Sequence, residues 1–387
     1  MKKGLFIIAG AALVLSSCQE DGIRNNYSED FQTGISFETF SNKVTRGEGA
    51  ENSGKEANNG LAKFHDSFFV WGSKYVNGTQ TPVFTKQIVN YASAADGWKY
   101  TPVRFWDKTA DKYDFYAAAP ATQNWVWNNN AKQLTLSAFA VTGATLAPTF
   151  DCLADAEMPD VDIMISNDVV RDDLLNKKTY DRVELLFNHI LSRLNIAVRK
   201  DKVLDEFIVK LNSIQVYDML QQGDFSESYS SADASGSAAR WENQSAKYTF
   251  GYTASGDGVI ASGDAYKYYY QGLVIPQEVA CKNIKLDGSD ATTSGAPYIC
   301  INYTLYTASG EAEIEVPGGN FVYYYNLAKI FNNYASGDAA VAFNEGWMNT
   351  LKITIKPDVI EFTPEVADWA TYKDVEVYVP ASGDATK

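Results

Sequence analysis

The chain has 387 residues and a formal net charge of −15, from 48 Asp and Glu against 33 Lys and Arg. Nucleic-acid affinity depends on clustered cations, so this acidic balance disfavours nucleic acid as a partner. The chain has two histidines, His65 and His189, and any histidine-based triad or multi-histidine metal site would have to use them.

The N-terminus has the layout of a secretory signal peptide. Lys2 and Lys3 precede an apolar segment, residues 5–15, that is too short to span a membrane. The Leu-Ser-Ser sequence before Cys18 resembles a bacterial lipobox. We therefore expect residues 1–17 to be a lipoprotein signal peptide and Cys18 to carry the lipid that holds the chain at a membrane surface. The alternative is an ordinary signal peptide with an incidental Cys18.

A polar leader, residues 18–46, follows the signal peptide and contains one short apolar segment. Ile35, Phe37 and Phe40 lie in this segment, which predicts a strand over residues 35–40. Residues 47–60 are rich in Gly, Glu and Asn and offer almost nothing to bury. The predicted strand is therefore isolated between two loose segments.

From residue 61 onward, short apolar runs alternate with turn residues. Those of the first half are residues 68–72, 83–84, 87–89, 98–106, 113–118, 125–127, 134–136 and 161–165. Those of the second half are residues 183–198, 207–209, 213–217, 266–275, 299–306, 314–316, 321–330, 351–355 and 375–379. Spacings of roughly ten residues predict an all-β chain of antiparallel sandwiches, and a change of period near His189 predicts one helical turn there. Residues 168–178 are charged and predict a connector, so we expect one domain over residues 47–178 and another over 179–369.

Three cysteines follow Cys18, and no CxxC motif occurs. An exported protein could form a disulfide between Cys281 and Cys300, which flank the turn-rich residues 287–290 and 294–297 in apparent strands. Buried thiols are the alternative. The chain also lacks GxSxG, HExxH and P-loop motifs, so we expect no enzymatic activity, no metal and no cofactor.

Several motifs, taken in order, resemble those of the fimbrillins, the lipoprotein-derived subunits of Bacteroidales-type fimbriae. They occupy residues 98–106, 113–120, 183–194, 272–277, 321–325 and 360–369, and together they span nearly the whole mature chain. The resemblance implies two tandem transthyretin-like antiparallel β-sandwich domains, export as a lipoprotein and polymerisation by donor-strand exchange. The implied partners are copies of the chain or other pilin subunits, a processing protease, and host or bacterial surface ligands in cell adhesion. The implied location is the outer membrane, through the lipid on Cys18, and the fimbrium on the cell surface after processing.

The resemblance also implies removal of the leader by an arginine- or lysine-directed protease. Arg46 is the candidate cleavage site because it lies in a Gly- and Glu-rich segment that is not expected to pack. Arg24 and Lys43 are nearby alternatives, and Arg46 could also be an incidental surface residue. A cut after Arg46 would release the strand over residues 35–40 and leave a groove that accepts another strand.

The candidate donor strand lies in the C-terminal tail, residues 370–387. Val375, Val377 and Val379 alternate there with polar residues, as in a half-buried strand. Burying three valines contributes roughly 5–9 kcal/mol, against an association cost of about 4–15 kcal/mol. Ladder hydrogen bonds must supply the rest. An ordinary edge strand is the alternative.

Two other functions remain open from the sequence. The chain could be a tip or anchor subunit rather than a stalk subunit. It could also be a surface lipoprotein that binds glycans through Trp125, Trp127 or the tyrosine-rich residues 266–270. Aromatic residues at this density more often form a core.

Overall fold

The computed structural model describes residues 34–43, 54–55, 60–152, 159–172, 181–229, 240–256, 258–261, 263–309, 312–332, 339–357 and 360–368. The signal peptide over residues 1–17, Cys18, Arg46 and the tail over residues 370–387, with Val375, Val377 and Val379, lie outside these described residues. In the described part, strands predominate and the single α-helix is α1, Leu327–Phe331. The prediction of an all-β chain is confirmed.

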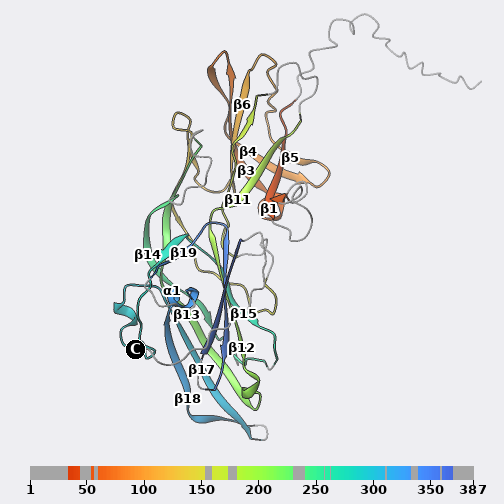
Figure 1. The fold of residues 1–387 in the computed structure, drawn as a ribbon. Coiled ribbons are helices and arrows are strands. Elements are labelled where there is room, and N and C mark those ends of the chain that lie inside the picture. Colours follow the sequence, from red (N-terminus) through yellow and green to blue (C-terminus); the bar gives the residue numbers. More distant parts are fainter. Residues whose placement is uncertain are drawn as a thin grey trace, which may run out of the picture.

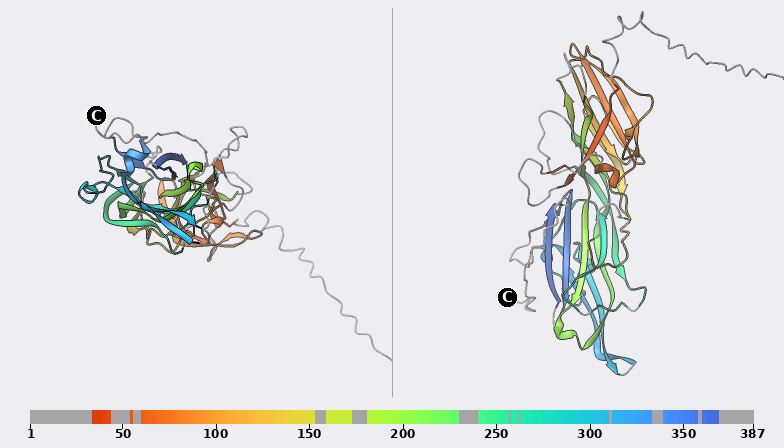
Figure 2. Two further views of the ribbon diagram at one scale, coloured as in Figure 1. Left: turned by 90° about the horizontal axis from the view of Figure 1, so that it is seen from below. Right: turned by 90° about the vertical axis from the view of Figure 1, so that its right-hand side faces the viewer.

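The described strands form an elongated body, with one sheet at one end and the remaining sheets at the other (Figures 1 and 2). The end sheet has nine strands in the order β2-β1-β11-β9-β6-β3-β4-β5, and β10 pairs with β6. Its strands are β1 (Phe37–Lys43), β2 (Gly54–Lys55), β3 (Ser67–Val76), β4 (Thr79–Ser93), β5 (Gly97–Lys99), β6 (Lys112–Ala119), β9 (Met164–Ser166), β10 (Val169–Arg171) and β11 (Val183–His189). A short 3-10 helix, η1 (Gly60–Lys63), leads into β3.

The other end of the body contains a four-stranded sheet, β15-β12-β20-β21, and a six-stranded sheet, β18-β17-β13-β8-β7 with β14 beside β13. A two-stranded pair, β16-β19, completes it. The bounds are β7 (Val126–Asn128), β8 (Gln133–Ala140), β12 (Ser192–Lys200), β13 (Phe207–Ser228), β14 (Trp241–Thr253), β15 (Lys267–Val274), β16 (Gln277–Val279), β17 (Tyr298–Ser309), β18 (Ala312–Asn326), β19 (Val341–Phe343), β20 (Trp347–Ile355) and β21 (Ile360–Asp368), with 3-10 turns η3 (Lys202–Leu204) and η4 (Ala291–Thr293).

The four- and six-stranded sheets pack face to face as a sandwich. Alternate residues of β12, β13, β17 and β20 point into one buried hydrophobic cluster, for example Ile196, Ile214, Ile301 and Ile353, all with no exposed surface. This period of two is what the alternating apolar sequence predicts.

The sheets do not follow the predicted boundary near residue 178. β11 lies beyond that boundary and yet belongs to the nine-stranded sheet, whereas β7 and β8 lie before it and yet belong to the six-stranded sheet. A further hydrophobic cluster includes Trp71 of β3, Leu134 of β8 and Leu273 of β15, and so joins the two ends of the body. The chain therefore crosses between the two ends more than once.

Among the strands that the structure describes, two pairings are parallel, although the sequence predicts antiparallel sheets. β1 pairs in parallel with β11, and β12 pairs in parallel with β20. Parallel neighbours need long connections, and well over a hundred residues separate the strands of each pair. The helical turn predicted near His189 is also wrong: residues 190–191, with a bend at Leu191, link β11 to β12.

Candidate functional site: the leading strand and its groove

The apolar segment near the start of the chain lies in the nine-stranded sheet. β1 runs parallel to β11, with Phe37 opposite Val183 and Ser41 opposite Phe187. Just before β1, the N–H of Ile35 donates a hydrogen bond of 2.8 Å to the carbonyl of Arg104. The leading strand is thus part of the folded sheet.

The side chains of this strand are buried on both of its faces. Ile35 and Phe37 are 2% and 3% exposed and belong to the core cluster of the nine-stranded sheet. Phe40 is 8% exposed and is not part of that cluster. Residues an odd number apart point to opposite faces of a strand, so Phe40 packs on the other side of the sheet from Phe37.

Phe37 is surrounded by aromatic rings. Its ring centroid lies 5.5 Å from that of Phe84, 5.7 Å from Tyr100, and 6.1 Å from both Phe68 and Phe115. Tilted and edge-on pairs at these distances contribute about 0.5–1.5 kcal/mol each beyond the area that they bury. Phe37 is therefore a central residue of this core.

Two polar side chains tie the leading strand to the sheet. The indole N–H of Trp98 donates a hydrogen bond of 2.9 Å to Oγ1 of Thr39, which is fully buried. The hydroxyl of Tyr100 donates one of 2.7 Å to the carbonyl of Ile35, and burial raises the pKa of Tyr100. Each bond satisfies an atom that would otherwise be costly to bury.

The other edge of β1 is only lightly covered by the described residues. It pairs with β2 through Asn42 and Lys43 alone. The 3-10 turn η1 packs closely against its end, since a Cβ on Gly60 would lie 2.7 Å from the backbone nitrogen of Ser41. Without β1, the edge of β11 and the aromatic rings around Phe37 would be exposed, and such an edge accepts an extended strand.

The two histidines lie close enough for their charges to interact, next to the strands that form this groove. Nδ1 of His189, the last residue of β11, lies 2.5 Å from Oδ2 of Asp162, and both side chains are buried. His65, which follows η1, is half-buried, and desolvation by burial lowers its pKa while the charge of Asp162 opposes that effect. Among the described residues, no three His, Cys, Asp or Glu side chains are grouped so that they could hold a metal ion.

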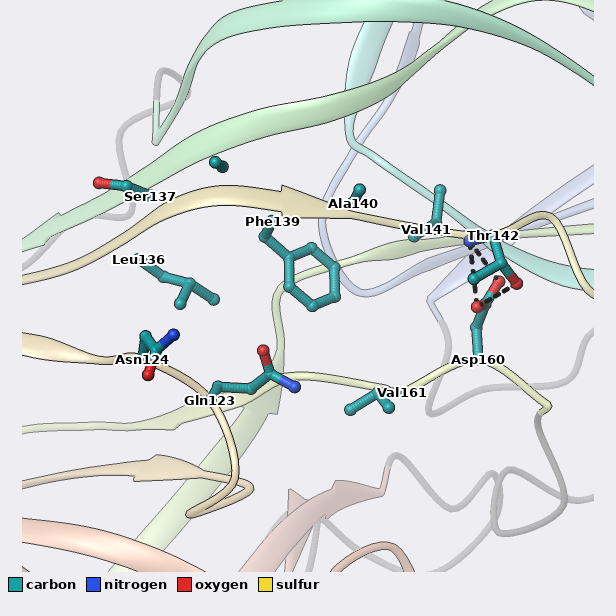
Figure 3. A pocket seen from close by; sticks show the side chains of 11 residues that line it. Gln123, Asn124, Leu136, Ser137, Phe139, Ala140, Val141, Thr142, Asp160 and Val161 are labelled. Carbon is teal, nitrogen blue, oxygen red and sulfur yellow. Dashed lines mark hydrogen bonds between the residues drawn. The ribbon is translucent and has the colours of Figure 1, made fainter.

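A small pocket of about 250 Å³ lies along the outer edge of β8 (Figure 3). Residues 136–142 line it together with Gln123, whose side chain faces the ring of Phe139. Asp160 closes one end, where its carboxylate accepts hydrogen bonds from the N–H and hydroxyl of Thr142 and the N–H of Gly143. Because these donors satisfy its carboxylate, Asp160 anchors the residues that follow β8 to its own segment.

The structure has no disulfide between Cys281 and Cys300; both are buried thiols. Cys281 points into the sandwich core, with Ile299 and Ile301. Cys300 lies between these two isoleucines on β17, so its side chain points to the opposite face of the sheet. The predicted bridge is therefore wrong, because the sheet separates the two sulfur atoms, and burial raises the pKa of the Cys300 thiol.

Most of the aromatic residues considered for glycan binding are core residues. Trp125 has no exposed surface, and Tyr268, Tyr269 and Tyr270 are each less than 5% exposed. Trp127 alone among the two tryptophans keeps part of its surface accessible. No helix in the described ranges is long and apolar enough to cross a membrane.

The fold and groove thus describe a β-structured protein whose leading strand completes its own sheet. The chain belongs to the fimbrillin-like family, whose model matches residues 57–369. Membership places it in a family of structural fimbrial subunits, which are exposed at the cell surface.

Three individual proteins are similar to this chain in sequence or in fold. The fimbrium subunit Fim1C of Phocaeicola vulgatus is 27% identical over 196 residues, which are 49% of this chain and 50% of that protein. The match thus spans about half the length of that relative. A fimbrial protein from Bacteroides vulgatus ATCC 8482 has a similar fold, with a TM-score of 0.50, 16% identity and coverage of 87% of this chain and 99% of the other. A candidate cell adhesion protein from Bacteroides uniformis ATCC 8492 matches over 87% and 99% of the two chains, with 14% identity and a TM-score of 0.40.

The sequence pattern identified Ile35, Phe37 and Phe40 as a strand, but not the residues that hold it. β11, Trp98 and Tyr100 provide its hydrogen bonds and most of its packing. The aromatic run over residues 98–106 was a signal of core packing, and no feature of the sequence linked it to the leading strand in particular.

Proposed function

We propose that the chain is a structural subunit of a fimbrium, made as a lipoprotein with its lipid on Cys18, cut near Arg46 and polymerised by donor-strand exchange. The observation that supports this most is the position of β1, which fills the core around Phe37 and yet, among the described strands, is paired along its length with β11 alone. A strand held in this way can be replaced once its covalent connection is cut.

The location of Arg46 in the sequence suits such a release. Arg46 lies between the end of β1 at Lys43 and the 3-10 turn that starts at Gly60. While the connection is intact, the strand competes for its groove at an effective concentration on the order of millimolar. Cleavage removes this advantage, so polymerisation would wait for the protease.

The candidate donor has a pattern that fits the vacated groove. Val375, Val377 and Val379 are spaced as Ile35, Phe37 and Thr39 are, with every second side chain turned the same way. Valine is smaller than phenylalanine, so the donor would fill the aromatic pocket less completely than β1 does. The exchange would then depend on the ladder hydrogen bonds with β11, each worth about 1 kcal/mol.

The test is to treat the purified precursor with an arginine-specific protease and to look for ladders that resist mild SDS. We expect ladders from the unaltered chain, together with a new N-terminus at Gly47. The Arg46→Ala variant should give none, whereas the Arg24→Ala variant should behave as the unaltered chain does. Trimmed protein that stays monomeric under conditions that polymerise a known stalk subunit would contradict the proposal.

The same assay separates a stalk subunit from a tip or anchor subunit. A stalk subunit needs both a groove and a donor, so deletion of residues 370–387 should abolish ladders. A tip subunit gives no donor, and the deletion would then leave its incorporation unchanged. The Val377→Asp variant is a milder form of this test, because a charge on the buried face of a donor strand costs several kcal/mol.

A further inference from the structure

An aromatic pocket with a volume of about 410 Å³ opens between the β3–β4 hairpin and β7. Small-molecule sites typically have volumes of roughly 300–1,000 Å³. This pocket is at the lower end of that range and therefore suits one small ring rather than a long chain. It shares no lining residue with the pocket beside β8, and it adjoins the core of the nine-stranded sheet through Phe84, whose ring packs on Phe37.

Three aromatic side chains form one wall of this pocket. Trp127 of β7 stacks on Tyr116 with ring centroids 4.3 Å apart and planes inclined by 29°. The ring of Trp71 on β3 lies 6.3 Å from that of Trp127 at an angle of 30°. Trp71 and Tyr116 are buried and fix the orientation of Trp127, which is itself partly exposed. Faces of this kind attract the weakly positive C–H groups of a sugar ring.

A β-bulge places a lysine at the rim. Val70 pairs with Gln87 and Gly72 with Phe84, so Thr85 and Lys86 together lie opposite Trp71. Lys86 has a φ of 58°, a backbone conformation that residues other than glycine seldom adopt. The bulge thereby redirects the side chain of Lys86, which lines the pocket.

The charge of the pocket contrasts with that of the chain. Lys86 is exposed, and its ammonium group lies 4.9 Å from the ring centroid of Phe69. Among the described residues that line the pocket, Lys86 carries the one formal charge and no carboxylate is present. In a chain with a net charge of −15, this local balance favours an anionic ligand.

A fixed amide supplies hydrogen-bond donors. Oδ1 of Asn129 accepts hydrogen bonds from Nε2 of Gln80 at 3.0 Å and from the hydroxyl of Ser73 at 3.5 Å. These bonds hold the amide plane, and Nδ2 makes no hydrogen bond to the described residues. The two N–H groups of Nδ2 can therefore donate to hydroxyl or carboxylate oxygens of a ligand.

We propose that this pocket binds a carboxylate-bearing pyranose, such as a terminal uronic acid of a glycan. The sugar ring packs on Trp127, the carboxylate pairs with Lys86, and Asn129 donates to ring hydroxyls. This binding would give a fimbrial subunit contact with acidic polysaccharide along its side, and it does not depend on strand exchange.

The test uses two ligands that differ only at C6, methyl β-D-glucuronide and methyl β-D-glucoside. Each is titrated into the purified full chain while tryptophan fluorescence and ligand-observed NMR are recorded. We expect the glucuronide to bind at least about tenfold more tightly than the glucoside. The Lys86→Ala variant should remove that difference, and Lys86→Arg should restore most of it.

Matched variants control for surface effects. Lys99 belongs to the same sheet, and its side chain is 61% exposed, so Lys99→Ala should leave binding unchanged. Trp347 is 41% exposed and lies in the four-stranded sheet, away from the pocket, so Trp347→Ala is the control for Trp127→Ala. If Trp127→Ala does not fold, Asn129→Ala tests the same pocket, with an expected loss of about fivefold to tenfold.

Equal affinity for the two ligands, no saturable binding of either, or equal effects of Lys86→Ala and Lys99→Ala would overturn the proposal. These outcomes are independent of whether the chain polymerises, because the titration uses the uncut chain. A result in which the chain forms ladders but binds neither sugar would refute the pocket and leave the fimbrial function intact.

Discussion

Replacing Phe37 by alanine tests whether the leading strand is a structural part of the first core. Phe37 is 3% exposed and lies within 6.1 Å, between ring centroids, of four aromatic side chains. Truncation of a buried phenylalanine costs about 3–5 kcal/mol, from lost transfer free energy and the cavity that remains. Because whole domains are stable by only about 5–15 kcal/mol, this is a large fraction of the stability of that core.

The assay is urea unfolding of the uncut chain, followed by tryptophan fluorescence because Trp98 bonds directly to the leading strand. With a slope of about 1–3 kcal/mol per molar urea, the midpoint should fall by about 1 M or more. Glu38→Ala is the matched control, since Glu38 is the next residue on the strand, points away from the core and is half-buried. If Phe37→Ala shifts the midpoint no more than Glu38→Ala, Phe37 does not contribute to the stability of the core.

Further variants probe the surroundings of the groove. Gly60→Ala should cost about 1–3 kcal/mol and speed strand release in the ladder assay, because its Cβ would meet the backbone nitrogen of Ser41 at 2.7 Å. The free energy of unfolding should fall as the pH drops below 6.5. Burial lowers the pKa of His65 in the folded state, so the unfolded chain binds the proton more readily. Thermal unfolding at several pH values measures this dependence. Asp114→Asn should cost about 2–4 kcal/mol in urea unfolding, because it leaves the ammonium of Lys132 without the buried carboxylate that it contacts.

Each of these variants has a matched control. Gly256 has no atom within 4 Å of an added Cβ, so Gly256→Ala should change stability little, and an equal effect at Gly60 would contradict the packing explanation. His65→Gln should reduce the loss of stability at low pH; an unchanged profile would assign that loss to other groups. Asp96 is 64% exposed, and Asp96→Asn should cost less than about 1 kcal/mol.

The apolar alternation of the sequence was sufficient to predict strands and their inward faces. Ile35 and Phe37 are two residues apart and point into one core, and the same rule places Ile299 and Ile301 together in the sandwich. It also indicates that Cys300, between those isoleucines, faces the other way. Cys281 lies outside any alternating run, so its direction could not be predicted, and the proposed disulfide failed for that reason.

Local sequence patterns could not predict which strands pair with one another. Nothing in residues 183–189 distinguishes a strand of the nine-stranded sheet from one of the sandwich, since both have one buried face. β8 and β11 each belong to the sheet at the other end of the body from the one that their place in the sequence suggests. This arrangement depends on contacts between residues far apart in the sequence, such as Trp71 with Trp127. The aromatic pocket forms where these distant segments come together and therefore has no sequence motif of its own.

The parallel pairing of β1 with β11 sets an order of events when the chain is made. Residues 37–41 emerge early, but their neighbours at residues 183–187 follow only after almost half of the polypeptide has appeared. Contacts between such distant residues form slowly, because the intervening chain must first be brought together. During translation, the first sheet therefore remains incomplete until residues 183–187 have been made, and the edge that β1 presents to them stays unpaired for that interval.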